Sequence, residues 1–129
     1  MMRAKKGFTL TEILVTVVVL AVLAALMIPR FSGQSERGVV AEAVAMLSAI
    51  RQAEAAYLLE NSSYTATLTD LDIDDPNAAP NPKFNYAFNT GMNATTAQRI
   101  GGGTFAGNTI ILNMDGTWDQ SASHPFKPK

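Results

Sequence analysis

Glu12 is the residue whose chemistry most needs an explanation. It lies within residues 8–28, a run that is otherwise almost purely apolar. An ionised side chain inside a helix that crosses a bilayer costs about 3 kcal/mol on insertion scales. A carboxylate kept there despite that cost indicates a charged partner or a task. No other part of the sequence sets such a conflict between one side chain and its surroundings.

The remaining polar groups predict no catalytic centre. His124 is the single histidine and the chain has no cysteine, which makes a transition-metal site very unfavourable. Asp115 and Asp119 flank a turn, where aspartate is common for backbone reasons. No serine or threonine lies in a nucleophile-elbow motif. We therefore expect a protein that is not an enzyme and that has no cofactor and no metal.

The apolar run is long enough to cross a membrane. Its 21 residues span roughly 32 Å as a helix, against a hydrocarbon core of about 30 Å. Arg3, Lys5 and Lys6 precede it, so the positive-inside rule predicts that the C-terminal part is exported. An ordinary secretory signal peptide is disfavoured, because the apolar run is too long, holds an acid and ends without a small-residue cleavage site. A plain single-pass anchor leaves Glu12 unexplained.

The charge of the exported part argues against nucleic acid as a partner. The chain has ten basic and eleven acidic residues, and three of the basic ones precede the apolar run. The remaining seven are scattered, whereas phosphate binding needs clustered Lys and Arg.

The motif KKG-FTLTEI at residues 5–13, followed by an apolar helix interrupted at Pro29, resembles the N-terminus of a type IV prepilin. This pattern is shared by type IV pilins, the pseudopilins of type II secretion and competence pilins. The close match covers about the first quarter of the chain. The rest is similar in general plan only, and the absence of cysteine departs from the pilins that close a C-terminal loop with a disulfide.

The resemblance implies processing and assembly. A membrane-embedded prepilin peptidase would cut between Gly7 and Phe8 and methylate the new amine of Phe8. Glu12 would pair with that amine, either its own or that of the next subunit, and so set the register of docking. The implied partners are the lipid bilayer before assembly, an inner-membrane assembly platform, and other copies of the chain in a homopolymer held by helix packing. The expected localisation is a single-pass inner membrane protein that later joins an extracellular filament.

These patterns predict an α+β chain, a long N-terminal helix on a small antiparallel sheet of three or four strands, as in the pilin fold. We expect a leader at 1–7, a transmembrane and filament-core helix at 8–30, and a head at 31–129. The head should comprise an amphipathic helix at 31–61, a loop at 62–83, the sheet at 84–119 and a tail at 120–129. Pro29 and Gly33 should kink the helix or let it melt.

Details of the head follow from local patterns. Strands are predicted at 84–88 and 109–114, with a weaker one at 98–100 and a returning strand at 117–119 after the turn signal Asp115-Gly116. A short helical turn is expected near Leu68, and an extended connection at 76–82. The acidic run at 70–75 has two interpretations, a calcium site or a solvated loop, and the solvated loop is favoured.

Three kinds of function follow. The first is a structural subunit of a type IV pilus, used for adhesion, motility or DNA uptake, with a major pseudopilin of type II secretion as the alternative. The second is a binding module such as a tip adhesin. The third, conduction of electrons along the aromatic residues, is disfavoured because packing explains those residues more simply.

Overall fold

The computed structural model describes residues 6–129, without the side chains of residues 28–32. The predicted leader therefore lies outside the described residues except for Lys6 and Gly7. The chain divides into two compact units, one ending at Glu36 and the other spanning Arg37–Lys129.

One helix dominates the secondary structure. Helix α1 runs over Leu10–Asn61 and includes Pro29 and Gly33 without a break in its bounds. None of the residues in the span Leu10–Met27 is buried by the described part of the chain. This span is the one helix in the described part of the chain that is long and apolar enough to cross a membrane. The kink or melting expected at Pro29 and Gly33 stays a prediction.

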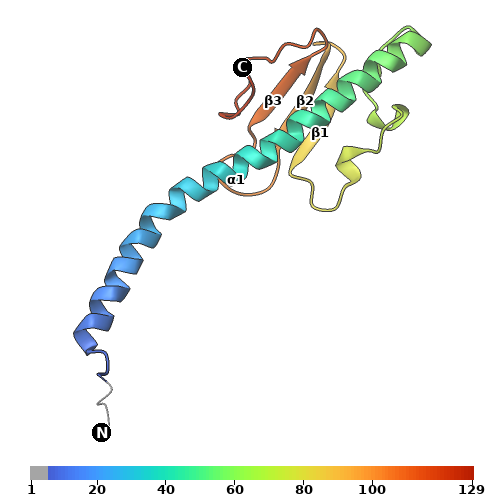
Figure 1. The fold of residues 1–129 in the computed structure, drawn as a ribbon. Helices are drawn as coiled ribbons and strands as arrows, with labels where there is room; N and C mark the ends of the chain where they lie inside the picture. Colours follow the sequence, from blue (N-terminus) through green and yellow to red (C-terminus); the bar gives the residue numbers. More distant parts are fainter. Residues whose placement is uncertain (1–5) are drawn as a thin grey trace. The chain divides into compact units, whose positions relative to one another are not determined.

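In the second unit α1 is amphipathic and packs on a three-stranded antiparallel sheet (Figure 1). The strands are β1 (Phe84–Asn89), β2 (Ala94–Arg99) and β3 (Thr109–Asn113), in the order β1-β2-β3. Along β1 every second residue is buried, which is the period of a strand with one face on a core. The predicted α+β arrangement is confirmed.

The core lies between the helix stripe and the inner face of the sheet. Its helix side chains recur at spacings of three and four residues, so that they share one face of α1. The largest contributors from the helix and the sheet are Val40, Leu47, Ile50, Phe84, Phe88 and Ile110, all at most 4% exposed.

Three local predictions were wrong. The second strand begins at Ala94, four residues before the expected 98–100, because Thr95 and Thr96 pair with both neighbouring strands. The returning strand at 117–119 is reduced to one bridge between Leu112 and Trp118. The connection at 76–82 is not extended throughout, since a 3-10 helix, η2, occupies Pro76–Ala78.

The loop after α1 closes one edge of the sheet. It contains η1 (Leu68–Asp70), which confirms the predicted helical turn, and then η2. The amide of Asn77 in η2 donates to the carbonyl of Tyr86 and accepts from its N–H, both at 2.8 Å. A side chain thus satisfies backbone groups of the edge strand β1 that would otherwise be open to pairing with another chain.

Candidate functional site: the N-terminal end of the apolar helix

The site begins with the two residues at the predicted cleavage point. Gly7 is exposed, and Phe8 is 85% exposed. A Cβ built on Gly7 meets no atom within 4 Å, and its φ does not lie in the left-handed region. Nothing in the fold of the described residues therefore requires glycine at this position, and the peptide bond between Gly7 and Phe8 is open to another molecule.

Glu12 forms a reciprocal cap with Thr9 at the start of α1. Its Oε2 accepts hydrogen bonds from the Thr9 backbone N–H at 2.8 Å and from the Thr9 hydroxyl at 2.9 Å. The Glu12 backbone N–H donates to the Thr9 hydroxyl at 3.3 Å. This is the capping box, Thr at the helix boundary and Glu three residues later. The carboxylate is also in the first turn, where the helix dipole favours negative charge.

The capping box explains in part why a carboxylate is tolerated at the start of an apolar helix. The uncleaved chain already supplies two donors to the carboxylate, both from a residue adjacent to Phe8. After a cut before Phe8, its new amine would lie one residue away from these donors. The side chains of Phe8, Thr11, Ile13 and Thr16 line an open groove together with Glu12. Sequence reasoning identified Glu12 but missed Thr9, although the T-x-x-E spacing is a readable signal.

The other candidate residues have structural roles. Asp115 Oδ1 accepts from the N–H and hydroxyl of Thr117, and these hydrogen bonds lower the pKa of the Asp115 carboxyl. Asp119 makes the same pattern with Ser121, with the same direction of pKa change. Both aspartates therefore build turns, as the turn interpretation predicted.

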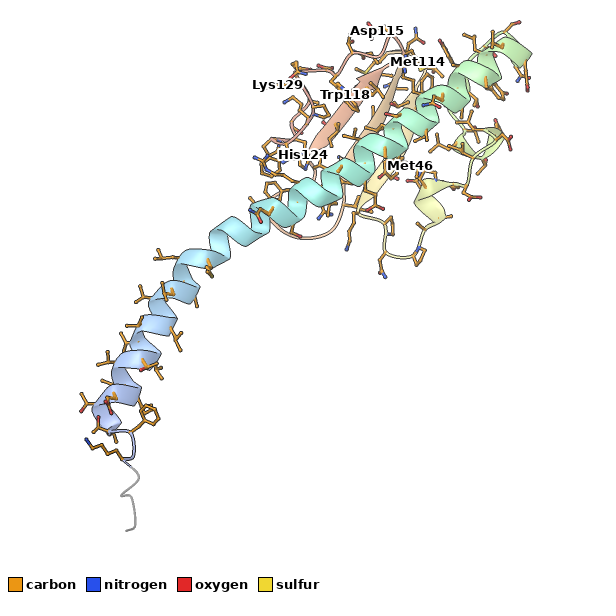
Figure 2. The ribbon with its side chains drawn as sticks, in the orientation of Figure 1. Met46, Met114, Asp115, Trp118, His124 and Lys129 are labelled. Carbon is orange, nitrogen blue, oxygen red and sulfur yellow. The ribbon has the colours of Figure 1, made fainter. Side chains whose placement is uncertain are left out.

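His124 lies in the segment predicted as a tail, 120–129, and its ring packs into the head. It is fully buried and stacks on Phe105, with ring centroids 5.8 Å apart. Its backbone N–H donates to Thr109 O at 2.9 Å, and its Nδ1 accepts from Phe126 N–H at 3.3 Å. The tail is held on the head through this ring (Figure 2).

Glu54 is a buried carboxyl that sequence reasoning missed. It is 0% exposed, and among the described residues its Oε1 has no hydrogen-bond partner. Oε2 accepts from the Thr65 N–H at 3.2 Å, in the loop after α1. Burial raises the pKa of the Glu54 carboxyl, and the hydrogen bond from Thr65 opposes that rise. The signal was its spacing from Leu47 and Ile50, which puts position 54 on the apolar stripe.

No metal centre is formed by the acidic side chains. Within residues 6–129, no group of three or more His, Cys, Asp or Glu side chains is arranged to hold an ion.

Comparison with known proteins gives one family motif. The family model described as "Prokaryotic N-terminal methylation motif" matches residues 2–28. That range contains Gly7, Phe8, Thr9 and Glu12, the residues whose geometry is described above.

Two kinds of named protein are similar to this chain over a longer stretch than the motif. Type II secretion system core protein G of Aeromonas hydrophila is 37% identical over 83 residues, covering 63% of this chain and 58% of that protein. The protein of the same name from Klebsiella pneumoniae is 38% identical over 87 residues, or 66% and 61%. A fimbrial protein of Pseudomonas aeruginosa is 35% identical over 71 residues, or 55% and 46%.

The chain thus spans less than two thirds of the length of the relatives it matches. No solved structure gives a significant match. The motif, the exposed apolar helix and the similarity to proteins of both names agree with one another, and together they support the assignment of the chain to a type IV pilin-like family.

Proposed function

We propose that this chain is a structural subunit, without enzymatic activity, of a filament that polymerises through the apolar part of α1. The observation that carries the proposal is the surface of the span Leu10–Met27. Each of its large apolar side chains is more than half exposed, and the exposed fraction runs from 51% at Val19 to 85% at Leu10. A continuous apolar surface of this length needs lipid or other apolar helices around it.

Two states of the chain satisfy that need in turn. Before assembly, α1 is solvated by the bilayer, with the predicted leader on the cytoplasmic side. During assembly an inner-membrane platform transfers the helix to the filament core, so that apolar surface leaves lipid only for other apolar surface. Repetition of one head-to-tail contact then gives an open-ended polymer.

The role proposed for Glu12 is to set the register of docking. In the uncleaved chain its carboxylate accepts hydrogen bonds only from Thr9, among the contacts described. Cleavage would add a cation at Phe8, and an unpaired charge in an apolar helix bundle would penalise each wrong register. Processing by a prepilin peptidase, which cuts before Phe8 and methylates it, is part of this proposal.

Mass spectrometry of the exported chain tests the processing step. The expected mature protein begins at Phe8 and carries one added methyl. Gly7→Val should leave the fold unchanged, since no atom lies within 4 Å of the added Cβ, yet it should block cleavage. Exported filaments built from chains that keep residues 1–7 would contradict the proposal.

Two settings fit such a subunit, a type IV pilus and the pseudopilus of a type II secretion system. Similarity to fimbrial protein supports the first, and the longer matches to core protein G support the second. Deletion of the chain in its own cell separates them. Loss of long surface fibres containing this chain identifies the pilus; normal surface fibres with retained secretory substrates identify the pseudopilus.

A further inference from the structure

Two grooves of opposite charge lie on the second unit, one on each flank of α1. The acidic groove, of about 440 Å³, is lined by Ala53, Tyr57, Glu60, Asp70, Asp72 and Ile73, among others. The basic groove, of about 460 Å³, lies between α1 and the C-terminal tail. It is lined by Arg37, Val40, Val44, Phe126, Lys127 and Pro128, among others.

The charges of the two grooves are complementary. The lining of the acidic groove includes three carboxylates and no Lys or Arg, and the lining of the basic groove includes two cations and no Asp or Glu. Lys129, which follows the groove residue Pro128 in the chain, is an exposed cation. Both floors are apolar, Ile73 and Tyr57 in one and Val40 and Phe126 in the other. Such a pattern, an apolar centre with a charged rim, is that of a protein interface.

The basic groove is held in shape by the head itself. The Arg37 guanidinium lies 4.8 Å from the centre of the Phe126 ring, a cation–π contact between α1 and the tail. The amide of Gln120 donates to Pro128 O at 3.1 Å. The backbone around Lys127 is therefore held by hydrogen bonds within the head, since its own N–H also donates to His124 O at 3.3 Å.

The grooves of one copy cannot fill each other. Their α1 residues, at 37–44 and 49–60, lie about 140° apart across the exposed face of the helix at about 100° per residue, and the buried stripe lies in the wider arc on the other side. Figure 1 shows the segment after α1 and the C-terminal tail on opposite sides of the helix, and Figure 2 places Lys129 on the tail side with His124. The grooves also lie at different heights along α1, so a partner that joins them must be displaced along the helix axis.

We propose that the basic groove of one copy docks on the acidic groove of the next copy in the polymer. This rests on the proposed function and names the contact between heads. Lys127 and Lys129 of one copy face Glu60, Asp70 and Asp72 of the neighbour, and the apolar floors meet between them. Because the two surfaces differ, the contact is heterologous, and its repetition extends the filament without closing it.

Cysteine cross-linking tests the contact directly, since the chain has no cysteine of its own. In filaments of the full-length double variant Asp72→Cys/Lys127→Cys, mild oxidation should give a ladder of multimers on a non-reducing gel. Neither single variant should give efficient dimers, because in this contact Asp72 faces Lys127 of the next copy and not another Asp72. The control pair Gln98→Cys/Lys127→Cys, with Gln98 exposed on β2 outside both grooves, should give no ladder.

Charge reversal gives a second readout. Glu60→Lys/Asp72→Lys and Lys127→Glu/Lys129→Glu should each lower filament yield at least about tenfold, because like charges then face each other. All four changes together should restore it. Lys83→Glu, an exposed cation outside both grooves, should have no such effect.

The outcomes separate this contact from the function on which it rests. Three results would overturn the contact and leave the filament intact. The double cysteine variant could form normal filaments without a ladder, or Asp72→Cys alone could give efficient dimers. In the third case, the two charge reversals would fail to rescue each other. A wild-type chain that forms no filament in its own cell would overturn the proposed function and this contact with it.

Discussion

The Nε of Arg51 in α1 donates a hydrogen bond to the carbonyl oxygen of Met114, 3.0 Å away and 63 residues later in the chain. Met114 opens the turn that follows β3, and the N–H of Gly116 closes that turn on Asn113 O at 3.0 Å. The guanidinium therefore joins the helix to the far end of the sheet. The pKa of the Asp115 carboxyl in the same turn is lowered mainly by the hydrogen bonds from Thr117, and the positive charge of Arg51 adds a smaller effect in the same direction.

Gly116→Ala should destabilise the head. The φ of Gly116 is +93°, where a side chain costs about 1–2 kcal/mol, and the added Cβ would lie 3.3 Å from the Arg51 Nη2. We expect the melting temperature to fall by roughly 4–16 °C, at about 4–8 °C per kcal/mol for a domain of this size. Fluorescence of Trp118, the single tryptophan, reports the unfolding of the full chain in detergent micelles.

Gly102→Ala is the matched control for this variant. Gly102 has no φ in the left-handed region and no atom within 4 Å of its added Cβ. Its melting temperature should stay close to that of the wild type. Equal losses in the two variants would mean that the turn beside Arg51 is not under special constraint.

Glu54→Gln should remove a pH dependence of stability. Burial raises the pKa of the Glu54 carboxyl above its ordinary value of 4.5. A raised pKa means that the folded state favours the protonated form, so this contribution is present below pH 4.5 and is lost as the pH rises through the folded pKa. The glutamine stays neutral and keeps an acceptor for the Thr65 N–H. We expect the variant to be more stable than the wild type at pH 7.

Urea unfolding at pH 4 and pH 7 measures this difference. Asp115 and Asp119 act in the opposite direction, because their lowered pKa values stabilise the fold above their ordinary value of 3.8. Their contribution is common to both proteins and cancels in the difference between variant and wild type. A difference that does not change between the two pH values would contradict the role given to burial of Glu54.

How far the sequence predicted this structure depended on whether a pattern was local. The apolar run, the amphipathic stripe and the alternation in β1 each indicate which residues share one face. Helix α1 and the sheet were therefore predictable from these patterns. The position of Glu54 on the apolar stripe was readable from its spacing, but its partner Thr65, like His124 and the Phe105 ring on which it stacks, lies in a segment without a periodic pattern. The return after Asp115 was overestimated because the turn is tied to Arg51 rather than to a full fourth strand.

The N-terminal site shows the same limit. The type and position of Glu12 pointed to a charge with a task, and its place four residues after Phe8 suggested the partner. Its hydrogen bonds from Thr9, both to Oε2, were equally readable from the T-x-x-E spacing. Which of the two interactions matters for assembly depends on other chains, and one sequence carries no record of their placement.

Pro29→Ala should straighten or strengthen α1 in the filament. Proline removes one backbone donor and crowds the preceding turn, at about 3 kcal/mol in a helix interior, although α1 continues past it. We expect the variant to form filaments that stretch less under force than the wild type, as measured with optical tweezers. A filament reconstruction of the variant with the same segment unwound would show that the proline is not the cause.

Two substitutions separate the charge of Glu12 from its capping role. Glu12→Gln keeps an oxygen for the Thr9 N–H, and glutamine serves in capping boxes, but it cannot pair with the amine of Phe8. Thr9→Val removes the hydroxyl that caps the helix, at about 1 kcal/mol, and leaves the carboxylate charged. If charge pairing sets the register, Glu12→Gln should insert in the membrane normally and lose most filaments, whereas Thr9→Val should retain them. Filament yield by electron microscopy, with membrane insertion by fractionation as control, decides between them. Normal filaments from Glu12→Gln, or their loss in Thr9→Val alone, would assign the assembly role to the cap rather than to the charge.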